Sequence, residues 1–505
     1  MRLLKHLLLA TAAGLLAASA AQAADLPTKK AAPAPDKPNC YASFWTWLDS
    51  TAADCPLTYA GITFYGTVDM GAGYETHATK FNNDFPNGVQ ELVNKTSGNA
   101  KWQWVPNGLS QSNVGVKIKE QIAPNWYIVG DVNFGFDPYS FQFANGPRSL
   151  EDNNLLASNP TQSANGDSSR AGGVDNTRAY VGVSNTTFGT LTFGRQYALT
   201  NDLSGAYDPF GGAYAFSLIG TSGTVEQGTG ETETARENLS FKYQVAYNGL
   251  RAAAIAQVGG WDQGNGARAA YQVDLGGDWN GFSADAVYAY AKDAVKLGTW
   301  GTGALGGLPA DTLKATLADV NAGVFGAKYK WQALTVYGGY EYARLSSPSD
   351  FNTYYPVAAA SGNIYNFNSS WSDYPAQVQK NAFYKPEILQ VLWVGAKYGI
   401  LSNLDAAVGY YYMWQNDYTT LTGAAVPANV ATASACAAAA APALGANHGS
   451  CAGHTEAISG MLDWRPVKRV DIYGGVMYSA VTGGMENGFT HPNNTAVTGG
   501  VRVAF

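Results

Sequence analysis

The sequence predicts an all-β fold, a 16-stranded antiparallel transmembrane β-barrel. Three observations support this prediction: short segments have apolar residues at every second position, short and long connections alternate between those segments, and aromatic residues gather where the segments end. A closed barrel satisfies the backbone hydrogen bonds of every strand without leaving a free sheet edge in the membrane.

The chain begins with an export signal. Arg2 and Lys5 precede an apolar run from Leu7 to Ala18, and Ala21-Gln22-Ala23 forms a small-residue cleavage motif. Because the run is shorter than the ~20 residues that a membrane-spanning helix needs, residues 1–23 are predicted to be a signal peptide rather than an anchor. Residues 24–60 are then expected to form an N-terminal linker with a small cysteine-containing segment.

The composition favours one large barrel over several packed domains. The 505 residues include 58 glycines, 31 tyrosines and 13 tryptophans, whereas charged residues make up only 14%. Mean hydropathy is −0.15, and no uninterrupted apolar run after the signal is long enough to span a membrane as a helix. The formal net charge of −7 argues against nucleic acid as a partner, because phosphate binding needs a basic surface.

Alternating segments occupy most of residues 61–505. In one of them Val181 and Val183 share one face and Arg178 and Tyr180 the other, which is typical of a wall between lipid and water. The predicted strands are 61–75, 110–121, 125–136, 176–184, 189–197, 236–246, 250–258, 268–278, 281–291, 322–331, 333–345, 387–399, 403–416, 454–464, 469–481 and 495–505.

The connections between these strands are alternately short and long. Short turns on one rim and long loops on the other are typical of bacterial outer-membrane barrels, so the short turns are predicted to be periplasmic and the long loops extracellular. Tyrosine and tryptophan at strand ends fit the two membrane interfaces. A β-sandwich would also use aromatic residues, but it would need no such girdle.

The four cysteines fall into two local pairs. Cys40 and Cys55 are fifteen positions apart, as are Cys436 and Cys451. Export places them in an oxidising compartment, so two disulfides, Cys40–Cys55 and Cys436–Cys451, are the preferred pairing among three possible connectivities. The alternative is four unpaired or metal-binding thiols, but no pair has the C-x₂-C spacing of a zinc site.

Several segments resemble the trimeric general porins of Gram-negative bacteria. ITFYGTVDMGAGY resembles the first strand of the neisserial and burkholderial porin group, and RAYVGVSNTTFGTLTFGRQY is similar to its fourth and fifth strands. DPFGG resembles the constriction-loop turn of enterobacterial porins, and the N-terminal linker with its cysteine pair resembles alphaproteobacterial members. The terminal Phe505 resembles the assembly signal of outer-membrane barrels.

The resemblance implies a homotrimer in the bacterial outer membrane, in contact with lipid and lipopolysaccharide, whose third long loop, 198–235, folds inward and narrows the channel. Its acidic candidates are Asp202, Asp208 and Glu226, and the basic wall they would face carries Arg178, Arg195 and Arg236. Alternation adds Lys117 and Lys119 as inward-facing residues.

Three positions qualify this picture. Asn113 and Thr67 stand where the enterobacterial pattern has basic residues, which should weaken the field across the pore. Arg195 has the parity of lipid-facing Leu191 and Phe193, so either a bulge at Gly194 re-aims it or it lies beyond the apolar band.

The predicted function is passive diffusion of ions and small hydrophilic solutes through a water-filled channel. The alternative is a substrate-selective channel for sugar, phosphate or peptide, which aromatic residues along the lumen would favour. No nucleophile motif, metal-ligand spacing or cofactor fingerprint stands out, so no enzyme activity, metal or cofactor is predicted. Residues 308–320 (LPADTLKATLADV) are expected to form a short amphipathic helix.

Overall fold

The computed structural model describes residues 39–78, 91–93, 98–141, 178–219, 236–258, 267–297, 313–346, 386–417, 450, 452–486 and 491–505. The predicted signal peptide 1–23, most of the linker, Glu226, Cys436 and Cys451 lie outside these residues.

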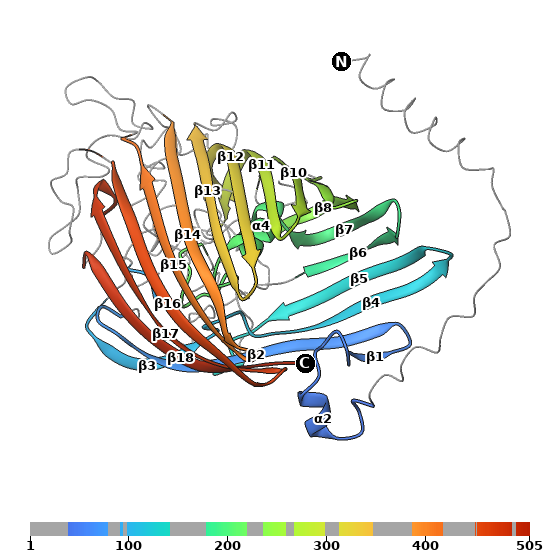
Figure 1. Ribbon diagram of the computed structural model, residues 1–505. Coiled ribbons are helices and arrows are strands. Elements are labelled where there is room, and N and C mark those ends of the chain that lie inside the picture. Colours follow the sequence, from blue (N-terminus) through green and yellow to red (C-terminus); the bar gives the residue numbers. More distant parts are fainter. Residues whose placement is uncertain are drawn as a thin grey trace, which may run out of the picture.

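A closed, 16-stranded antiparallel barrel forms the body of the molecule, as the sequence predicts (Figure 1). Each barrel strand pairs with its sequence neighbours, and β18 pairs with β2 to close the ring. The barrel strands are β2 (Ile62–Glu75), β4 (Asn113–Ala123), β5 (Trp126–Gly135), β6 (Arg178–Asn185), β7 (Gly189–Tyr197), β8 (Arg236–Tyr247), β9 (Leu250–Gln257), β10 (Ala269–Trp279), β11 (Phe282–Leu297), β12 (Leu313–Trp331), β13 (Leu334–Ser346), β14 (Glu387–Leu401), β15 (Leu404–Gln415), β16 (Gly453–Val467), β17 (Val470–Gly483) and β18 (Asn493–Ala504).

Two further strands pair with β2 beside its barrel partners. The short β1 (Leu57–Tyr59) lies against the start of β2, whereas β3 (Lys101–Pro106) takes the second half of β2 and leaves the first half to β4. Pro106 and the left-handed Asn107 (φ 63°) end β3. The turn before β4 is held by Asp69, whose carboxylate accepts the Leu109 N–H at 2.7 Å.

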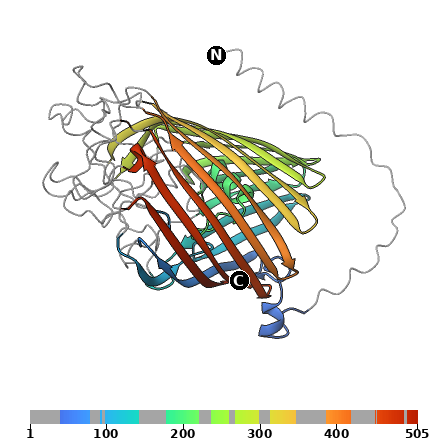
Figure 2. The ribbon, with the colours of Figure 1, turned by 60° about the vertical axis from the view of Figure 1, so that its left-hand side comes forward.

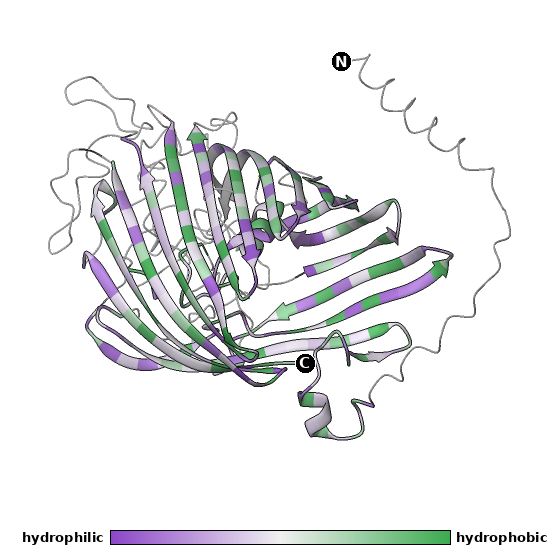
Figure 3. Cartoon of the chain, viewed as in Figure 1, coloured by the Kyte–Doolittle hydropathy of each residue, from purple (hydrophilic) through white to green (hydrophobic). Residues whose placement is uncertain are grey.

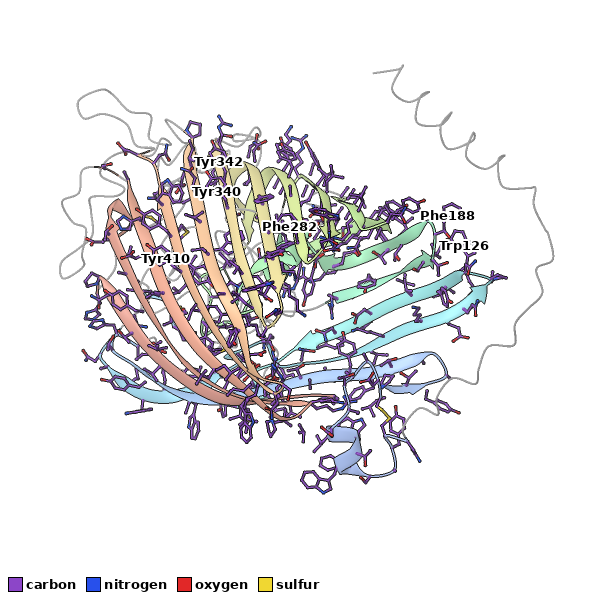
Figure 4. The ribbon with its side chains drawn as sticks, in the orientation of Figure 1. Trp126, Phe188, Phe282, Tyr340, Tyr342 and Tyr410 are labelled. Atoms are coloured by element: carbon purple, nitrogen blue, oxygen red, sulfur yellow. A yellow bond between two sulfur atoms is a disulfide. The ribbon has the colours of Figure 1, made fainter. Side chains whose placement is uncertain are left out.

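The alternation predicted for the strands is visible as bands of opposite hydropathy (Figure 3). On β6 the outward Val181 is 58% exposed, as suits a lipid-facing residue. Aromatic residues gather at the short-turn rim: the rings of Trp126 and Phe188 lie 6.4 Å apart there (Figure 4). Trp279 and Trp331 are also exposed beside short turns.

The N-terminal segment forms a small module outside the barrel. It contains α2 (Phe44–Leu48) and the predicted Cys40–Cys55 disulfide, which is confirmed. Figure 2 shows it at the same end of the barrel as the C-terminus. Arg469, in the turn between β16 and β17, holds it there by donating to the carbonyls of Trp47 at 2.9 Å and Cys55 at 2.6 Å.

The prediction of a helix at 308–320 is wrong over its described part. Residues from Leu313 onward extend β12 and pair with β11, with Leu313 opposite Leu297. The inter-strand hydrogen bonds to β11 outweigh the local helical pattern, as tertiary pairing commonly does. The structure also contains a helix that the sequence does not predict. This helix, α4 (Leu199–Tyr207), lies in the lumen of the barrel. A short 3₁₀ helix, η1 (Gly484–Glu486), follows β17.

Candidate pore constriction

The third long loop begins with α4, which lies inside the barrel (Figure 1). Leu199, Leu203 and Tyr207 recur at helical spacing on its buried face, and the helix contacts β9 to β13. The N-cap residue of α4, Ala198, has no side chain that could accept a hydrogen bond from the first turn. Instead, the Thr200 N–H donates to Oε1 of Gln272 on β10 at 3.0 Å, so the start of the helix is fixed to the wall.

Asp208 organises the turn that follows α4. Its carboxylate accepts the N–H groups of Phe210 at 3.0 Å and Gly212 at 2.9 Å, and the hydroxyls of Ser217 at 3.1 Å and Tyr411 at 2.5 Å. The residue is 2% exposed. Burial raises the pKa of Asp208, because desolvation of the charged form outweighs these hydrogen bonds.

The position of Asp208 differs from the expectation that it faces the basic wall. Its partners are turn N–H groups and hydroxyls, and its described hydrogen bonds include none to lysine or arginine. The physical reason lies in the DPFGG turn itself. Gly211 and Gly212 take positive φ angles of 66° and 78°, and the turn points its N–H groups at one acceptor, which the short side chain of Asp208 supplies.

Glycines in the barrel wall make room for this loop. A Cβ atom at any of four glycines would meet a loop side chain at 2.5–2.7 Å, too close for a real contact. The pairs are Gly326 with Tyr207, Gly395 with Pro209, Gly409 with Phe210, and Gly475 with Phe216. The four glycines lie on β12, β14, β15 and β17, so the loop packs closely against the wall at four positions along its path.

Hydrogen bonds also fix the loop to this part of the wall. Nε1 of the buried Trp393 donates to the Tyr207 carbonyl at 3.1 Å. At the far end the Ala215 N–H donates to the Gly108 carbonyl, between β3 and β4, at 2.9 Å. The described part of the loop therefore follows the wall from β10 to β17, and the inner faces of β4 to β7 lie across the lumen from it.

The inner face of β5 and β6 carries an arginine held by a carboxylate and a tyrosine. Nη2 of Arg178 lies 3.2 Å from Oδ2 of Asp131 and 3.0 Å from the hydroxyl oxygen of Tyr65. The Tyr65 hydroxyl donates to Asp131 at 2.5 Å. Each of the three groups thus contacts the other two, which fixes the guanidinium in one place on the wall.

A second tyrosine links this arginine to Arg236. The guanidinium carbons of Arg178 and Arg236 lie 4.7 Å and 5.2 Å from the centroid of the Tyr197 ring. The negative face of an aromatic ring attracts a cation, so one ring supports two like charges at once. Arg236 is only 4% exposed, which places most of its surface against the wall rather than in the pore.

Lys117 and Lys119 are the exposed cations of this wall. Their ammonium groups lie 4.2 Å from the Tyr65 ring and 5.1 Å from the Tyr127 ring. Both side chains are exposed, and within the described ranges neither forms an ion pair with a carboxylate. They therefore present uncompensated positive charge on the lumen side of β4.

The structure contains the bulge considered for Arg195. The register between β7 and β8 shifts between Gly194 and Gln196, and Gly194 has a φ of 137°. The Arg195 guanidinium donates to Oδ1 of Asn238 on β8. A glycine allows this backbone conformation at little cost, and the bulge breaks the alternation that would have aimed Arg195 at lipid with Leu191.

Asp202 contacts a lysine that the sequence analysis did not select. Its carboxylate lies 2.5 Å from Nζ of Lys242 on β8, and the same ammonium group donates to the Tyr197 carbonyl at 2.9 Å. Lys242 is 6% exposed. Lys242 lies between outward-facing Phe241 and Tyr243, so strand alternation alone would have predicted that it faces the lumen.

The two positions that lack the expected basic residues form a neutral stretch. Nδ2 of Asn133 donates to Oδ1 of Asn113 at 3.0 Å, and Nδ2 of Asn113 donates to the Gln111 carbonyl at 2.8 Å. Thr67 pairs with Asn113 across β2 and β4. This part of the wall therefore carries amide and hydroxyl groups instead of charge.

A transmembrane barrel with an internal loop packed against its inner wall is the architecture of an outer-membrane channel protein. Residues 10–367 match the family model for Gram-negative porins, and the chain belongs to this family. No curated protein sequence matches it.

Several solved structures of outer-membrane proteins are similar to the chain at low sequence identity, and the first of them, with a TM-score above 0.5, shows the same fold. The anion-selective porin from Comamonas acidovorans is 13% identical, with 88% of this chain and 99% of that chain covered and a TM-score of 0.53. The outer-membrane-expressed OmpT of Vibrio cholerae is 14% identical, with 89% and 100% covered and a TM-score of 0.48. The outer membrane channel DcaP of Acinetobacter baumannii is also 14% identical, with 89% and 99% covered and a TM-score of 0.48.

Proposed function

We propose that this porin is a general diffusion channel whose narrowest part lies between the internal loop and the inner faces of β4 to β7. The observation that supports this proposal best is the loop itself, anchored through Asp208, Trp393 and Gly108 across from a wall that carries fixed cations. Charges fixed in a narrow gap act on passing ions through Coulomb forces that water screens only partly.

The channel is expected to prefer anions weakly. Arg178 is paired with Asp131 and Lys242 with Asp202, so these cations contribute little net field. Lys117 and Lys119 supply the surplus positive charge. The neutral Asn113 and Thr67 limit its strength.

A second candidate function is a solute-selective channel. The observation that favours it is a group of inward tyrosines on neighbouring strands: Tyr65, Tyr127, Tyr180 and Tyr197. Aromatic faces stack on sugar rings and other flat solutes. Their contacts with lysine and arginine show that these rings also support cations, which fits the general channel equally.

Further properties belong to the same proposal. The channel acts as a homotrimer embedded in outer-membrane lipid and lipopolysaccharide, without catalytic activity. It is of the alphaproteobacterial type, similar to the neisserial and burkholderial group, and the disulfide-closed N-terminal module supports that assignment.

Reconstitution in planar bilayers tests this function. The purified full-length protein should form ohmic channels, and a potassium chloride gradient should give a small reversal potential of the sign for anion preference. Lys117→Gln with Lys119→Gln should bring that potential toward zero, whereas Lys468→Gln, on a periplasmic turn, should leave it unchanged. Absence of ohmic current from the wild type would overturn the proposal. Strong saturation by one sugar would favour the selective channel.

A further inference from the structure

We propose an anion-binding site at the periplasmic exit of the channel, built around Lys328 and Lys330 of β12. Its ligand class is a small anion with a phosphate or carboxylate group. The inference deepens the proposed channel function and rests on it. The site is separate from the wall formed by β4 to β7. It lies on β11 to β13, next to the last turn of α4.

The site is a cavity with a volume of about 480 Å³. It lies between the turn that joins β10 to β11 and the inner faces of β12 and β13. Its polar lining consists of Asp278, Asn280, Ser283, Lys328, Lys330, Thr335 and Tyr337. The volume falls within the range of small-molecule sites, and it is large enough for a small dianion with part of its hydration shell.

Strand register brings the donor groups of the cavity together. Lys328 stands opposite Ser283 of β11 on one side and Tyr337 of β13 on the other. Lys330 stands opposite Thr335. Side chains opposite each other on one sheet face lie about 5 Å apart at Cβ, so two ammonium groups and three hydroxyls share one small surface.

Alternation confirms that this surface faces the lumen. Tyr329 and Trp331, on either side of Lys330, are 48% and 60% exposed on the outer face of the barrel. Lys328 and Lys330 therefore point inward. The left-handed Gly281 (φ 82°) closes the neighbouring turn without a side chain, where a Cβ atom would lie 2.7 Å from the Lys330 carbonyl oxygen.

The lysines keep donors free for a ligand. Nζ of Lys328 donates to the Ala206 carbonyl at 3.0 Å and lies 5.2 Å from the Tyr207 ring. An ammonium group has three N–H donors, so Lys328 retains two. The side chain of Lys330 is exposed, and its ammonium group forms no hydrogen bond or ion pair with any residue that the structure describes.

The nearby carboxylates are engaged elsewhere. Asp278 is the one acidic residue in the lining, and it forms an ion pair with Arg251. The same arginine holds Asp285 at 2.8 Å. On the next strand pair, Asp405 lies 3.2 Å from Lys397 and 2.9 Å from Arg465. Arg251 is shared by Asp278 and Asp285, so these three groups with Lys328 and Lys330 carry a formal net charge of +1. The surplus positive charge lies on the two lysines, as an anion requires.

Single-channel recording with added anions tests this site. Inorganic phosphate and succinate are titrated separately into both chambers at constant ionic strength, and the concentration for half-maximal reduction of the current is measured. The double variant Lys328→Gln, Lys330→Gln should raise that concentration about tenfold or more, because two charge-assisted contacts are lost. Lys330→Arg, which keeps the charge, should retain the block if the double variant does not fold. Lys468→Gln is the matched control on another periplasmic turn.

The outcomes separate this inference from the channel function. Saturable block by either anion, weakened by the double variant and not by Lys468→Gln, supports the site and identifies its preferred group. An ohmic wild-type channel with no saturable block, or with equal weakening in Lys468→Gln, would overturn the site and leave the channel intact. Failure of the wild type to conduct would overturn the channel function itself.

Discussion

At the scale of single residues, the hydroxyl of Tyr411 and the carboxylate of Asp208 hold the constriction loop against β15. Both side chains are buried, and the hydrogen bond between them is 2.5 Å long. A hydrogen bond to a charged acceptor contributes roughly 1.5–3 kcal/mol. The contact joins residues about two hundred positions apart, so it determines loop position rather than local turn geometry.

Tyr411→Phe is predicted to loosen the loop without unfolding the barrel. The carboxylate of Asp208 keeps its three bonds within the loop but loses its bond to the wall. Single-channel recordings should show larger open-channel current noise. Tyr410→Phe is the matched control, because Tyr410 lies on the lipid face and donates to Glu456. Equal noise in the two variants would contradict this role of Tyr411.

Residue-level prediction from the sequence succeeded where strand parity was sufficient. Arg178, Lys117 and Lys119 lie on the inner face, as the alternation predicted, although their part in conduction remains to be measured. The sharing of Tyr197 by two arginines could not be foreseen, since it joins β6, β7 and β8 through a bulge. The sequence predicts a pore-facing Asp208. The hydroxyl groups that bind its carboxylate in the structure are distant in the chain or in the loop itself, and they cannot be recognised from the sequence.

At the scale of elements, the loop and the wall fit each other through glycines. The strands were predictable because each needs only a local period of two. The path of the loop was not, because it depends on Gly326, Gly395, Gly409 and Gly475, which lie far along the chain. The same limit explains 313–320, where pairing with β11 overrides a local helical pattern.

Gly409→Val is predicted to narrow the channel. The added Cβ atom would lie 2.7 Å from Cε2 of Phe210, so the turn must move toward the lumen. Single-channel conductance should fall, while the barrel remains resistant to heat in detergent. Gly460→Val serves as the control, because a Cβ atom there meets nothing within 4 Å. An unchanged conductance in Gly409→Val would show that the turn yields in another direction.

At the scale of the whole molecule, the N-terminal module is attached to the barrel through one arginine. Arg469 is 3% exposed and donates to the carbonyls of Trp47, Thr51 and Cys55 at 2.6–3.1 Å. Its guanidinium also lies 4.2 Å from the Trp47 ring. One side chain therefore supplies most of the described polar contact between module and barrel.

Arg469→Gln is predicted to release the module from the barrel. Glutamine has fewer N–H donors than a guanidinium group, so the three carbonyl groups would accept hydrogen bonds from water instead. Hydrogen–deuterium exchange over residues 40–55 should accelerate, while channel conductance stays at the wild-type value. Lys468→Gln, at the neighbouring exposed position, should leave the exchange rate unchanged. Slow exchange in Arg469→Gln would mean that apolar contacts hold the module.

Closure of the ring at β2 and β18 has a consequence for the time before the barrel is complete. Backbone groups of Phe505 and Gly66 exchange hydrogen bonds of 2.9 and 3.0 Å across the junction. Until β18 pairs with it, β2 has an open edge, and an unpaired strand edge can pair with other chains and aggregate. The two ends of the barrel sequence therefore protect each other, and neither edge is covered until both have folded.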